Sequence, residues 1–576
     1  MMNQSLQSLL SEYSHIGHLF VDCMRRNPDF TCQIDAATGQ EETNASVLSR
    51  SIRLAQALRK FGLRPGDVLA LGGNNHLDLH IPYYAALLNG YPIAGVDPLF
   101  KYSELRSLFK ITQPKIAFCQ RTSLEEYERA AHDLGLDMKI VTFEEGEGSM
   151  KELLSTYDII EPEAEFKIAK FDVDKVYAFL ISTSGTTGFP KVAAFKHRIT
   201  MEKFLTFMKY SNKMSTIGLN LSPVQWISGI FNAVAMPISS QTKVQTSRPD
   251  DIDHLIEMIN KYKPPSMFMS PALMLVLLRR WDEVDLSCLK EILITGAKTN
   301  VAAINELRGR LHKNTNIKEA YGMTETLGPV LTPNVNGPVG SCGKPTHGYA
   351  IKLVDPDTGS EIKEPYQNGE LLAKGLCFTE YLGNPEETRK SFTEDGYFKT
   401  GDLLYRDEKD NYFFVDRIKM LIKFRNVHVV PSELEEVILQ HHGVLDVCVT
   451  SIPHPDDDEH PVACVIRKPD SIVTAQEIKE LVSNHLSKNK VLCGGVVFVD
   501  KLPMTSSDFS TKAKSCWIYF EQLTYFVFEI LTKMLKTVFI LAIVAMLVGE
   551  SIQQGGGGQG GMGGGPPPKF GGMYTF

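Results

Sequence analysis

Residues 182–191 read STSGTTGFPK, with five hydroxyl side chains and two glycines in the first seven positions and a lysine at the end. The apolar run Val176–Ile181 precedes them and predicts a buried strand that leads into a loop. Gly185 and Gly188 let backbone amides turn toward an anion, the hydroxyls add donors, and Lys191 adds a positive charge. The stretch therefore predicts a phosphate-binding loop at the end of a strand.

This loop differs from the nucleotide-kinase loop GxxxxGK[ST]. Pro190 precedes the lysine, and Val192 follows it in place of serine or threonine. A linker rich in serine, threonine and glycine would have a similar composition. Further motifs that follow in order along the chain favour the phosphate loop over the linker.

From about residue 45 to residue 500 the chain alternates helix-like and strand-like stretches, as layered α/β proteins do. Residues 49–61 place apolar side chains on one helical face, and Gly62 can end that helix. The apolar runs at 68–71 and 291–295 predict buried strands. Apolar residues spaced three and four apart over 301–311 predict a further helix.

Length and composition limit the class of protein. The 576 residues exceed what one hydrophobic core can hold, so we expect about three to four compact units. The formal net charge of −8 gives no general attraction for nucleic acid, so no nucleic-acid partner is expected. The ten cysteines form no CxxC pair and have no nearby histidine partner, which favours reduced thiols in an intracellular protein and argues against a zinc site. The first residues lack a long apolar core, so no secretory signal is expected.

The end of the chain differs in kind from the rest. The alternation stops at about Ser510, and the apolar run Val538–Gly549 is shorter than the roughly 18–20 residues of a spanning helix. The glycine-rich stretch after Gln554 cannot bury a core and is expected to be disordered. Two hypotheses remain open for this tail: a segment foreign to the rest of the protein, joined from a second reading frame, or a weak membrane contact.

Four motifs resemble, in order and spacing, those of the adenylate-forming superfamily, which includes acyl-CoA synthetases, coumarate–CoA ligases, beetle luciferases and peptide-synthetase adenylation domains. They are residues 182–191, AYGMTET at 320–326, TGD at 400–402 and VDRIKMLIKFRNVHVVPSELE at 415–435. The resemblance covers roughly residues 15–505. Stretches such as YYAALLNGYPIAGVDP at 83–98 are most similar to the insect luciferase-like and coumarate–CoA ligase branch.

The resemblance implies an α/β fold in three parts. Residues 1–417 would form a large N-terminal AMP-binding domain of layered α/β subdomains with a small β-barrel-like part. Residues 418–508 would form a small, mobile C-terminal cap domain of the α+β type, and residues 509–576 the atypical tail.

The resemblance also implies an ATP site. Lys191 and the hydroxyls of its loop would hold the β- and γ-phosphates, and Thr324 the α-phosphate. Asp402 would accept both ribose hydroxyls with Arg417 as its helper, while Tyr321 would stack on adenine. The full set of expected ATP-binding residues is Thr183, Ser184, Gly185, Thr186, Thr187, Gly188, Lys191, Gly296, Ala297, Tyr321, Gly322, Thr324, Asp402 and Arg417.

Catalytic roles are implied for Thr324, Glu325 and Lys423. Glu325 would bind Mg²⁺, a hard cation that prefers carboxylate, water and phosphate oxygens. In the second half-reaction coenzyme A would attack the acyl-adenylate after the cap domain turns about Lys419, which brings Lys423 to the site. The structural alternatives are a solvated loop carboxylate for Glu325 and a solvated basic face for the two lysines.

The sequence predicts the residues of the acid pocket less well than those of the nucleotide site. Leu327 and Gly328 should line the path of an apolar acid, which suggests a fatty or aryl-propenoic acid. Trp226 falls where relatives carry an aromatic gate, with core packing as the alternative. The expected pocket residues are Trp226, Ser228, Gly229, Leu327 and Gly328.

The sequence departs from the superfamily at three positions. Val192 and Asn426 stand where glycine is usual, and Phe509 stands where the closing pattern PKTxSGKxxR has its catalytic lysine. Losing one donor to the transition state costs on the order of 10²–10³ in rate, so slow adenylation is expected. The chain also ends Tyr574-Thr575-Phe576, without the peroxisomal tripeptide common in relatives.

Three functions follow from these observations. The leading one is an ATP- and coenzyme A-dependent acid–thiol ligase. The alternatives are a luciferase-like monooxygenase and an adenylation-impaired protein that binds nucleotide or acyl groups.

Overall fold

The computed structural model describes residues 6–157, 162–183, 191–210, 216–248, 251–334, 337–425, 427–455, 457–487 and 490–502. All of them belong to one compact unit, Met1–Ala513. The predicted tail, including Phe509 and the apolar run at 538–549, lies outside the described residues, as do Asn426 and the loop residues Ser184–Pro190.

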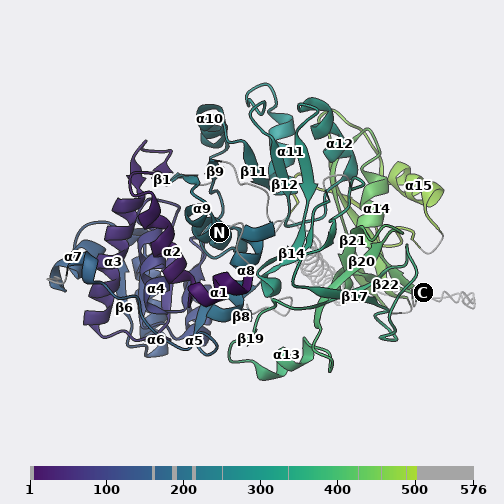
Figure 1. Ribbon diagram of the computed structural model, residues 1–576. Coiled ribbons are helices and arrows are strands. Elements are labelled where there is room, and N and C mark those ends of the chain that lie inside the picture. The colour runs from purple at the N-terminus through teal and green to yellow at the C-terminus, as the bar shows by residue number, and fades with distance from the viewer. Residues whose placement is uncertain are drawn as a thin grey trace, which may run out of the picture. The chain divides into compact units, whose positions relative to one another are not determined.

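The first sheet of seven strands explains why apolar runs in this sequence become strands. Leu69 and Leu71 of β3 pack into the core that holds α3 and α4, whereas Ala70 between them packs into a second core with α5 and α6. Helices therefore cover both faces of the sheet (Figure 1), and the strands read as continuous apolar runs. The strand order is β19-β8-β7-β4-β3-β5-β6. The five strands β7, β4, β3, β5 and β6 are parallel to one another, whereas β8 is antiparallel to both β7 and β19.

The elements of this sheet are β3 (Leu69–Gly72), β4 (Ile93–Val96), β5 (Ile116–Cys119), β6 (Lys139–Thr142), β7 (Tyr177–Thr183), β8 (Lys191–Lys196) and β19 (Glu380–Tyr381), with α3 (Asn44–Phe61), α4 (His80–Asn89), α5 (Tyr102–Thr112), α6 (Leu124–Leu134), α7 (Met150–Thr156) and α8 (His197–Tyr210).

A second sheet of seven strands has the order β13-β12-β11-β9-β10-β1-β2. All its neighbours are parallel except β1 and β2. Its strands are β1 (Thr31–Asp35), β2 (Glu41–Thr43), β9 (Ile217–Leu219), β10 (Thr242–Gln245), β11 (Ser266–Met269), β12 (Glu291–Ile294) and β13 (Asn316–Glu319), and its core includes α10 (Ile252–Tyr262), α11 (Pro271–Arg279) and α12 (Val301–Arg310). The helices α1 (Leu6–Glu12), α2 (Ile16–Arg26) and α9 (Ile227–Ile238) contribute to the same core as α3 and α4.

Two small antiparallel sheets lie within residues 321–417, and a bridge between Gly343 and Tyr412 links them. Their elements are β14 (Tyr321–Met323), β15 (Gly328–Thr332), β16 (Lys344–Pro345), β17 (Ala350–Val354), β18 (Gly369–Lys374), β20 (Phe398–Arg406) and β21 (Tyr412–Arg417), with α13 (Pro385–Lys390) before β20.

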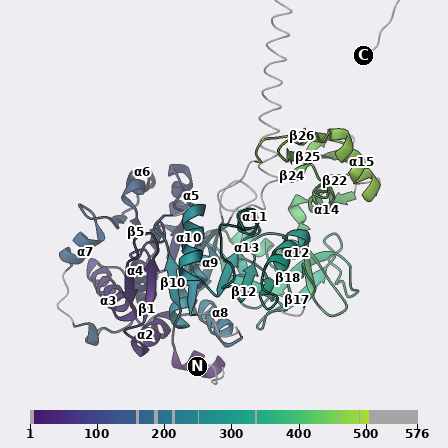
Figure 2. The same ribbon diagram turned by 90° about the horizontal axis from the view of Figure 1, so that it is seen from above.

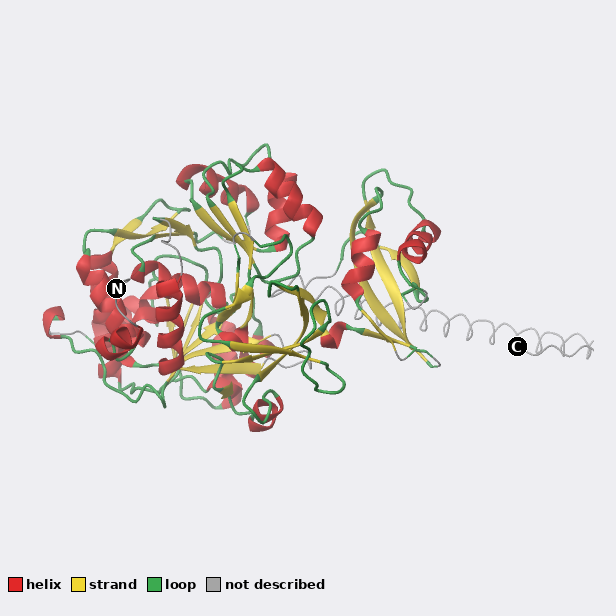
Figure 3. Cartoon of the chain, turned by 45° about the vertical axis from the view of Figure 1, so that its right-hand side comes forward, coloured by secondary structure: helices red, strands yellow, loops and turns green. Residues whose placement is uncertain are grey.

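The C-terminal part of the described chain has its own sheet and core, as the cap domain requires. Strands β24 and β25 form a long hairpin, and α14 and α15 pack on the sheet around Phe424, Val449 and Val465 (Figures 2 and 3). The elements are β22 (Ile422–Phe424), β23 (Val427–Val429), β24 (Val444–His454), β25 (Asp458–Arg467), β26 (Gly495–Phe498), α14 (Pro431–Ile438) and α15 (Ala475–His485). Four short 3₁₀ turns complete the list: η1 (Arg121–Ser123), η2 (Glu163–Glu165), η3 (Thr324–Thr326) and η4 (Ile418–Met420).

The structure confirms the local predictions and corrects their boundaries. The helix predicted at 49–61 begins earlier, because Thr43 caps α3 by accepting a hydrogen bond from the Ser46 amide, and it ends where Gly62 adopts φ 114°. Of the cysteines within the described ranges, seven are free thiols: Cys23, Cys32, Cys119, Cys288, Cys342, Cys377 and Cys493. No helix in these ranges is both long enough and apolar enough to cross a membrane.

Candidate functional site

A cavity of about 1750 Å³ opens at the carboxyl ends of parallel strands in the second sheet. Ile294 ends β12 and Glu319 ends β13, and both line the cavity together with the loops that follow them. This edge of an α/β sheet is the usual place for a ligand. The volume exceeds the roughly 300–1,000 Å³ of one small-molecule pocket, so the cavity has room for two ligands. The sequence-predicted residues that line it are Trp226, Gly296, Ala297, Tyr321, Gly322, Asp402 and Arg417.

Asp402 is a buried acid that lines this cavity. It lies on β20 directly opposite Arg417 of β21, and the Arg417 Nε is 3.4 Å from its Oδ1. The Tyr321 hydroxyl donates a hydrogen bond of 2.7 Å to Asp402 Oδ2. Burial raises the pKa of Asp402 to about 6 although Arg417 and Tyr321 act to lower it. Its Oδ1 is buried without a hydrogen-bond donor, so it offers an acceptor to a ligand's hydroxyl groups.

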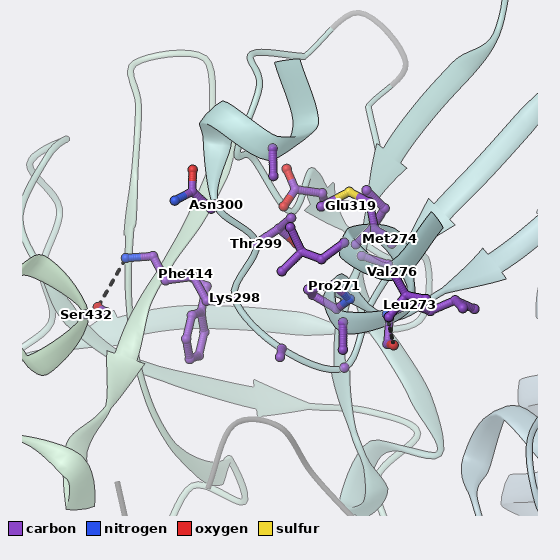
Figure 4. Close-up of a pocket in the computed structure, with 18 of the residues that line it drawn as sticks. Pro271, Leu273, Met274, Val276, Lys298, Thr299, Asn300, Glu319, Phe414 and Ser432 are labelled. Carbon is purple, nitrogen blue, oxygen red and sulfur yellow. Dashed lines mark hydrogen bonds between the residues drawn. The ribbon is translucent and has the colours of Figure 1, made fainter. Parts of the chain in front are cut away.

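Two aromatic side chains lie beside this acid. Tyr321 and Phe414 both line the cavity, with ring centres 6.1 Å apart and an interplanar angle of 29°. Because the Tyr321 hydroxyl is bonded to Asp402, the tyrosine ring is held in one orientation beside it. Phe414 was not among the predicted residues, although its position three residues before Arg417 could have suggested it (Figure 4).

Lys191 lies at the first residue of β8, paired with Thr183 at the end of β7. This pair closes the loop whose residues Ser184, Gly185, Thr186, Thr187 and Gly188 lie outside the described ranges. The Lys191 ammonium forms an ion pair with Glu387 of α13 and lies 4.9 Å from the centre of the Tyr381 ring. The expected phosphate-binding cation is thus held by a carboxylate that sequence reasoning missed.

Tyr381 connects Lys191 to the expected metal-binding residue. Glu325 lies on η3 directly after Thr324, it is buried, and its Oε1 accepts a hydrogen bond of 2.7 Å from the Tyr381 hydroxyl. One tyrosine therefore contacts both the cation and the carboxylate. Neither Tyr381 nor Glu387 stands in the four motifs, so their roles depend on α13 and β19 lying against β8.

Several predicted pocket residues do not line this cavity. Leu327 is fully buried in the main hydrophobic core, and a Cβ on Gly328 would come within 2.8 Å of the Phe231 ring. Ser228 lies in the first turn of α9, and a Cβ on Gly229 would come within 2.1 Å of the Pro223 carbonyl oxygen. At 229 and 328, glycine is required by close packing.

Trp226 does line the cavity and is 38% exposed, which excludes the core-packing alternative for this residue. It precedes the first residue of α9 as that helix's N-cap position. Its indole is therefore available to a ligand.

The two lysines of the cap domain lie apart from the cavity. Lys419 is exposed on η4, and Lys423 is exposed on β22, where it pairs with His428 of β23. The Lys423 amide donates a hydrogen bond of 2.7 Å to Glu459 Oε2. In this structure, therefore, Lys423 is not brought together with Thr324 and Glu325.

Lys298 is a further residue that sequence reasoning missed. It directly follows Gly296-Ala297, and its ammonium bonds Ser432 Oγ at 3.2 Å and Glu436 at 2.8 Å (Figure 4). Both partners belong to α14, so this lysine contacts the cap domain at the cavity's edge. Its position next to the predicted residues Gly296 and Ala297 could have suggested it.

Two protein-family descriptions match long parts of the chain. The family described as AMP-binding enzyme matches residues 20–381, and the family described as AMP-binding enzyme C-terminal domain matches residues 433–508. The chain is 30% identical to luciferin 4-monooxygenase of Photinus pyralis over 477 residues, which cover 80% of this chain and 86% of that protein. It is 28% identical to 4-coumarate-CoA ligase 1 of Narcissus pseudonarcissus over 499 residues, 83% of this chain and 89% of that protein.

Solved structures show the same fold. ATP-bound MatB from Rhodopseudomonas palustris superposes with a TM-score of 0.76 at 24% identity, over 85% of this chain and 96% of that one. The luciferase-like enzyme from the nonluminescent Zophobas morio mealworm gives a TM-score of 0.64 at 27% identity, over 70% of this chain and 95% of that one.

Proposed function

Because this chain belongs to the AMP-binding, adenylate-forming enzyme family, we propose that it joins a fatty or aryl-propenoic acid to coenzyme A at the expense of ATP. The observation that carries the proposal is the buried Asp402, whose Oδ1 accepts no hydrogen bond, beside two aromatic rings in a cavity with room for nucleotide and acid. Coenzyme A as the thiol rests on the similarity to 4-coumarate–CoA ligases.

The reaction has two balanced steps. A carboxylate oxygen of the acid attacks the α-phosphorus of ATP. The bond between the α-phosphorus and the oxygen that bridges to the β-phosphate breaks, and pyrophosphate leaves. The coenzyme A thiolate then attacks the acyl carbon of the adenylate, and AMP leaves. Activation is needed because a free carboxylate would have to expel oxide. Since negative charge gathers at the α-phosphate and on pyrophosphate, donors and cations aimed there lower the barrier.

Residues that line the cavity and residues outside its lining would divide this work. Asp402 accepts the ribose hydroxyls, and the rings of Tyr321 and Phe414 contact adenine. Lys191 leaves Glu387 and binds the outer phosphates, while Thr324 donates to the α-phosphate. These interactions hold the α-phosphorus in line with the acid, so positioning supplies part of the rate.

Mg²⁺ would be held by Glu325. Its carboxylate oxygens are the ligand type that this cation prefers, and its burial next to Tyr381 fixes the side chain. When bound, the ion would neutralise charge on the phosphates.

Pyrophosphate release tests the proposed function. The full chain is mixed with MgATP and a panel of straight-chain fatty and aryl-propenoic acids, with and without coenzyme A. We expect acid-dependent pyrophosphate release, and acyl-CoA formation when coenzyme A is present. If acyl-adenylate accumulates and no acyl-CoA forms in the presence of coenzyme A, the thiol-ligase proposal is contradicted.

A luciferase-like monooxygenase is the second candidate, because the chain is 30% identical to luciferin 4-monooxygenase. Light from synthetic luciferin with MgATP and oxygen would support it. Acyl-CoA formation without light would leave the ligase as the function.

Adenosine binding should depend on the ionisation of Asp402. Because the pKa of Asp402 is raised to about 6, its carboxylate is protonated at pH 5 and ionised at pH 7. Only the ionised form accepts two ribose hydroxyls, so we expect affinity about tenfold lower at pH 5 than at pH 7. Adenosine carries no phosphate to titrate, and equilibrium dialysis measures its affinity directly. The Asp402→Asn variant should remove the pH dependence of adenosine affinity. If the affinity of this variant still changes between pH 5 and pH 7, another group causes the dependence.

Glu387 should weaken ATP binding by competing for Lys191. In Glu387→Ala the ammonium no longer has this carboxylate, so we expect ATP affinity to rise by about 1.5–5-fold, the range of a partly exposed ion pair. Isothermal titration without acid measures the affinity. Glu386→Ala is the matched control, because Glu386 lies next to it on α13 and pairs with the exposed Lys390 at 2.7 Å. Weaker ATP binding in Glu387→Ala would show that Glu387 assists the nucleotide.

A further inference from the structure

Two histidines and one aspartate meet at the tip of the β24–β25 hairpin in the cap domain. They are His454, Asp457 and His460, and their ligand-type atoms all lie within 4.8 Å of one another. Asp457 Oδ2 lies 2.8 Å from His460 Nε2 and 3.9 Å from His454 Nδ1. Among the described residues, it is the one group of three or more histidine, cysteine, aspartate or glutamate side chains whose ligand atoms are close enough to hold one ion.

The register of the hairpin explains why the two histidines lie together. His460 is directly opposite Ile452, and His454 is two residues further along the same strand as Ile452. Side chains opposite each other and two apart share one face of a sheet, so both imidazoles project from the same face. Their rings stack with centres 3.8 Å apart at an angle of 15°.

We propose that His454, Asp457 and His460 bind a divalent transition-metal ion of the zinc class, with water completing the coordination. Two imidazoles and a carboxylate suit zinc, copper or nickel, whereas magnesium and calcium prefer oxygen ligands alone. Metal bonds of about 2.0–2.2 Å in a tetrahedral site set ligand atoms roughly 3.4 Å apart. The two distances to Asp457 Oδ2 bracket this value. The stacked imidazoles would have to turn out of their nearly parallel arrangement, so that a nitrogen of each ring points to the same ion.

Arg425 is the present competitor for this site. Its Nε and Nη2 bond the two oxygens of Asp457 at 2.9 and 3.2 Å, and its side chain is 63% exposed. An ion pair so exposed contributes little, so a bound metal ion can take Oδ2 and leave Oδ1 to Arg425. The carboxylate would then bridge the ion and the guanidinium.

The site is separate from the expected Mg²⁺ position. None of the three residues lines the large cavity, and Glu325 lies in another domain. The hairpin is nevertheless bonded to the segment that carries Lys423, through the Glu459–Lys423 hydrogen bond and the pairing of Phe424 with Asp458. A metal ion at the tip would therefore restrain the residues around Lys423.

The cysteine pattern by itself predicts no zinc site. The ligands proposed here are histidines spaced six residues apart, a spacing that indicates nothing until the hairpin register is known. The inference stands independently of the proposed acid–thiol ligase function, because metal binding is measured without substrate.

Metal titration of the untagged, chelator-treated full chain tests the site. Zn²⁺ binding is measured by calorimetry, and Co²⁺ is added as a spectroscopic probe. We expect one tight site per chain and a Co²⁺ absorption spectrum of low coordination without a sulfur charge-transfer band. The double variant His454→Ala/His460→Ala should lower the affinity by at least about 100-fold, because losing one outer-shell partner of a metal ligand already costs about 10–100-fold and here two ligands are removed.

His441→Ala/His442→Ala is the matched control. These histidines also stack, with ring centres 4.6 Å apart, in the same domain after α14, and the double variant should keep the affinity of the unsubstituted chain. An equal loss in both double variants would show adventitious binding and overturn the proposal. Binding that persists in His454→Ala/His460→Ala but disappears in Cys493→Ser would assign the metal to the exposed thiol and also overturn it.

A folding defect is distinguished by a milder variant. Asp457→Asn keeps the size of the side chain and should lower Zn²⁺ affinity while the metal-free protein unfolds at the same temperature as the unsubstituted chain. Unchanged affinity in this variant would remove Asp457 from the site and contradict the three-ligand proposal.

Discussion

The Phe509→Lys variant is expected to form acyl-adenylate about 10²–10³ times faster than the unsubstituted chain. A lysine at this place in the family's closing pattern would give the transition state a cation near the α-phosphate, where negative charge gathers. In this chain the segment Leu502–Phe509 reads LPMTSSDF, and the match to the C-terminal family ends at residue 508. The impairment is therefore proposed from the sequence, since Phe509 lies outside the described residues.

Acid-dependent exchange of pyrophosphate into ATP, without coenzyme A, measures this step alone. Ser510→Lys is the matched control, because it adds the same charge one residue away, at a position not expected to bring the lysine to the α-phosphate. Thiolysis of a supplied acyl-adenylate should change little in either variant. An unsubstituted chain that already adenylates at rates ordinary for the family would contradict the prediction, and so would an equal gain in Ser510→Lys.

The Asp402→Asn variant is expected to bind ATP about 10²–10³ times more weakly at pH 7.5. Two hydrogen bonds from ribose hydroxyls to a carboxylate contribute roughly 1.5–3 kcal/mol each, and a neutral amide accepts at only one atom. The amide also presents its NH₂ group to Tyr321, Arg417 or the ribose, all of which need an acceptor there. The expected loss therefore exceeds that of one hydrogen bond.

Isothermal titration with ATP measures the change. Asp410→Asn is the matched control, because Asp410 is exposed on the same β20–β21 hairpin and pairs with Arg406 at 2.8 Å, away from the cavity. Thermal unfolding should show that both variants keep the fold. If Asp402→Asn binds ATP as tightly as Asp410→Asn does, the nucleotide lies elsewhere and the assignment of the cavity fails.

Much of the fold could be predicted from local patterns. The runs at 68–71, 176–181 and 291–295 are strands in the structure as β3, β7 and β12, each within two residues of its predicted ends. Their continuous apolar character reports burial on both faces of a parallel sheet, which is a property of neighbouring residues. The motif at 400–402 likewise pointed to Asp402 before its burial was known.

The acid pocket could not be predicted in the same way. Leu327 and Gly328 follow a motif directly, yet Leu327 lies in the core and Gly328 packs against Phe231. Position next to a motif fixes the distance along the chain but not the direction of a side chain. The backbone at Leu327 adopts φ 45°, which turns the chain between η3 and β15 in a way that residue spacing does not reveal.

The sequence by itself determined the family, the strands and the chemical types at the nucleotide site, because each is written in short contiguous stretches. Only the tertiary structure decided which partners meet: Lys191 with Glu387, Tyr381 with Glu325, and His454 with His460. The first two pairs join residues 196 and 56 positions apart, and the third depends on which residue of β24 faces which residue of β25. Such contacts follow from chain topology and strand register, which the local periodicity of the sequence does not reveal.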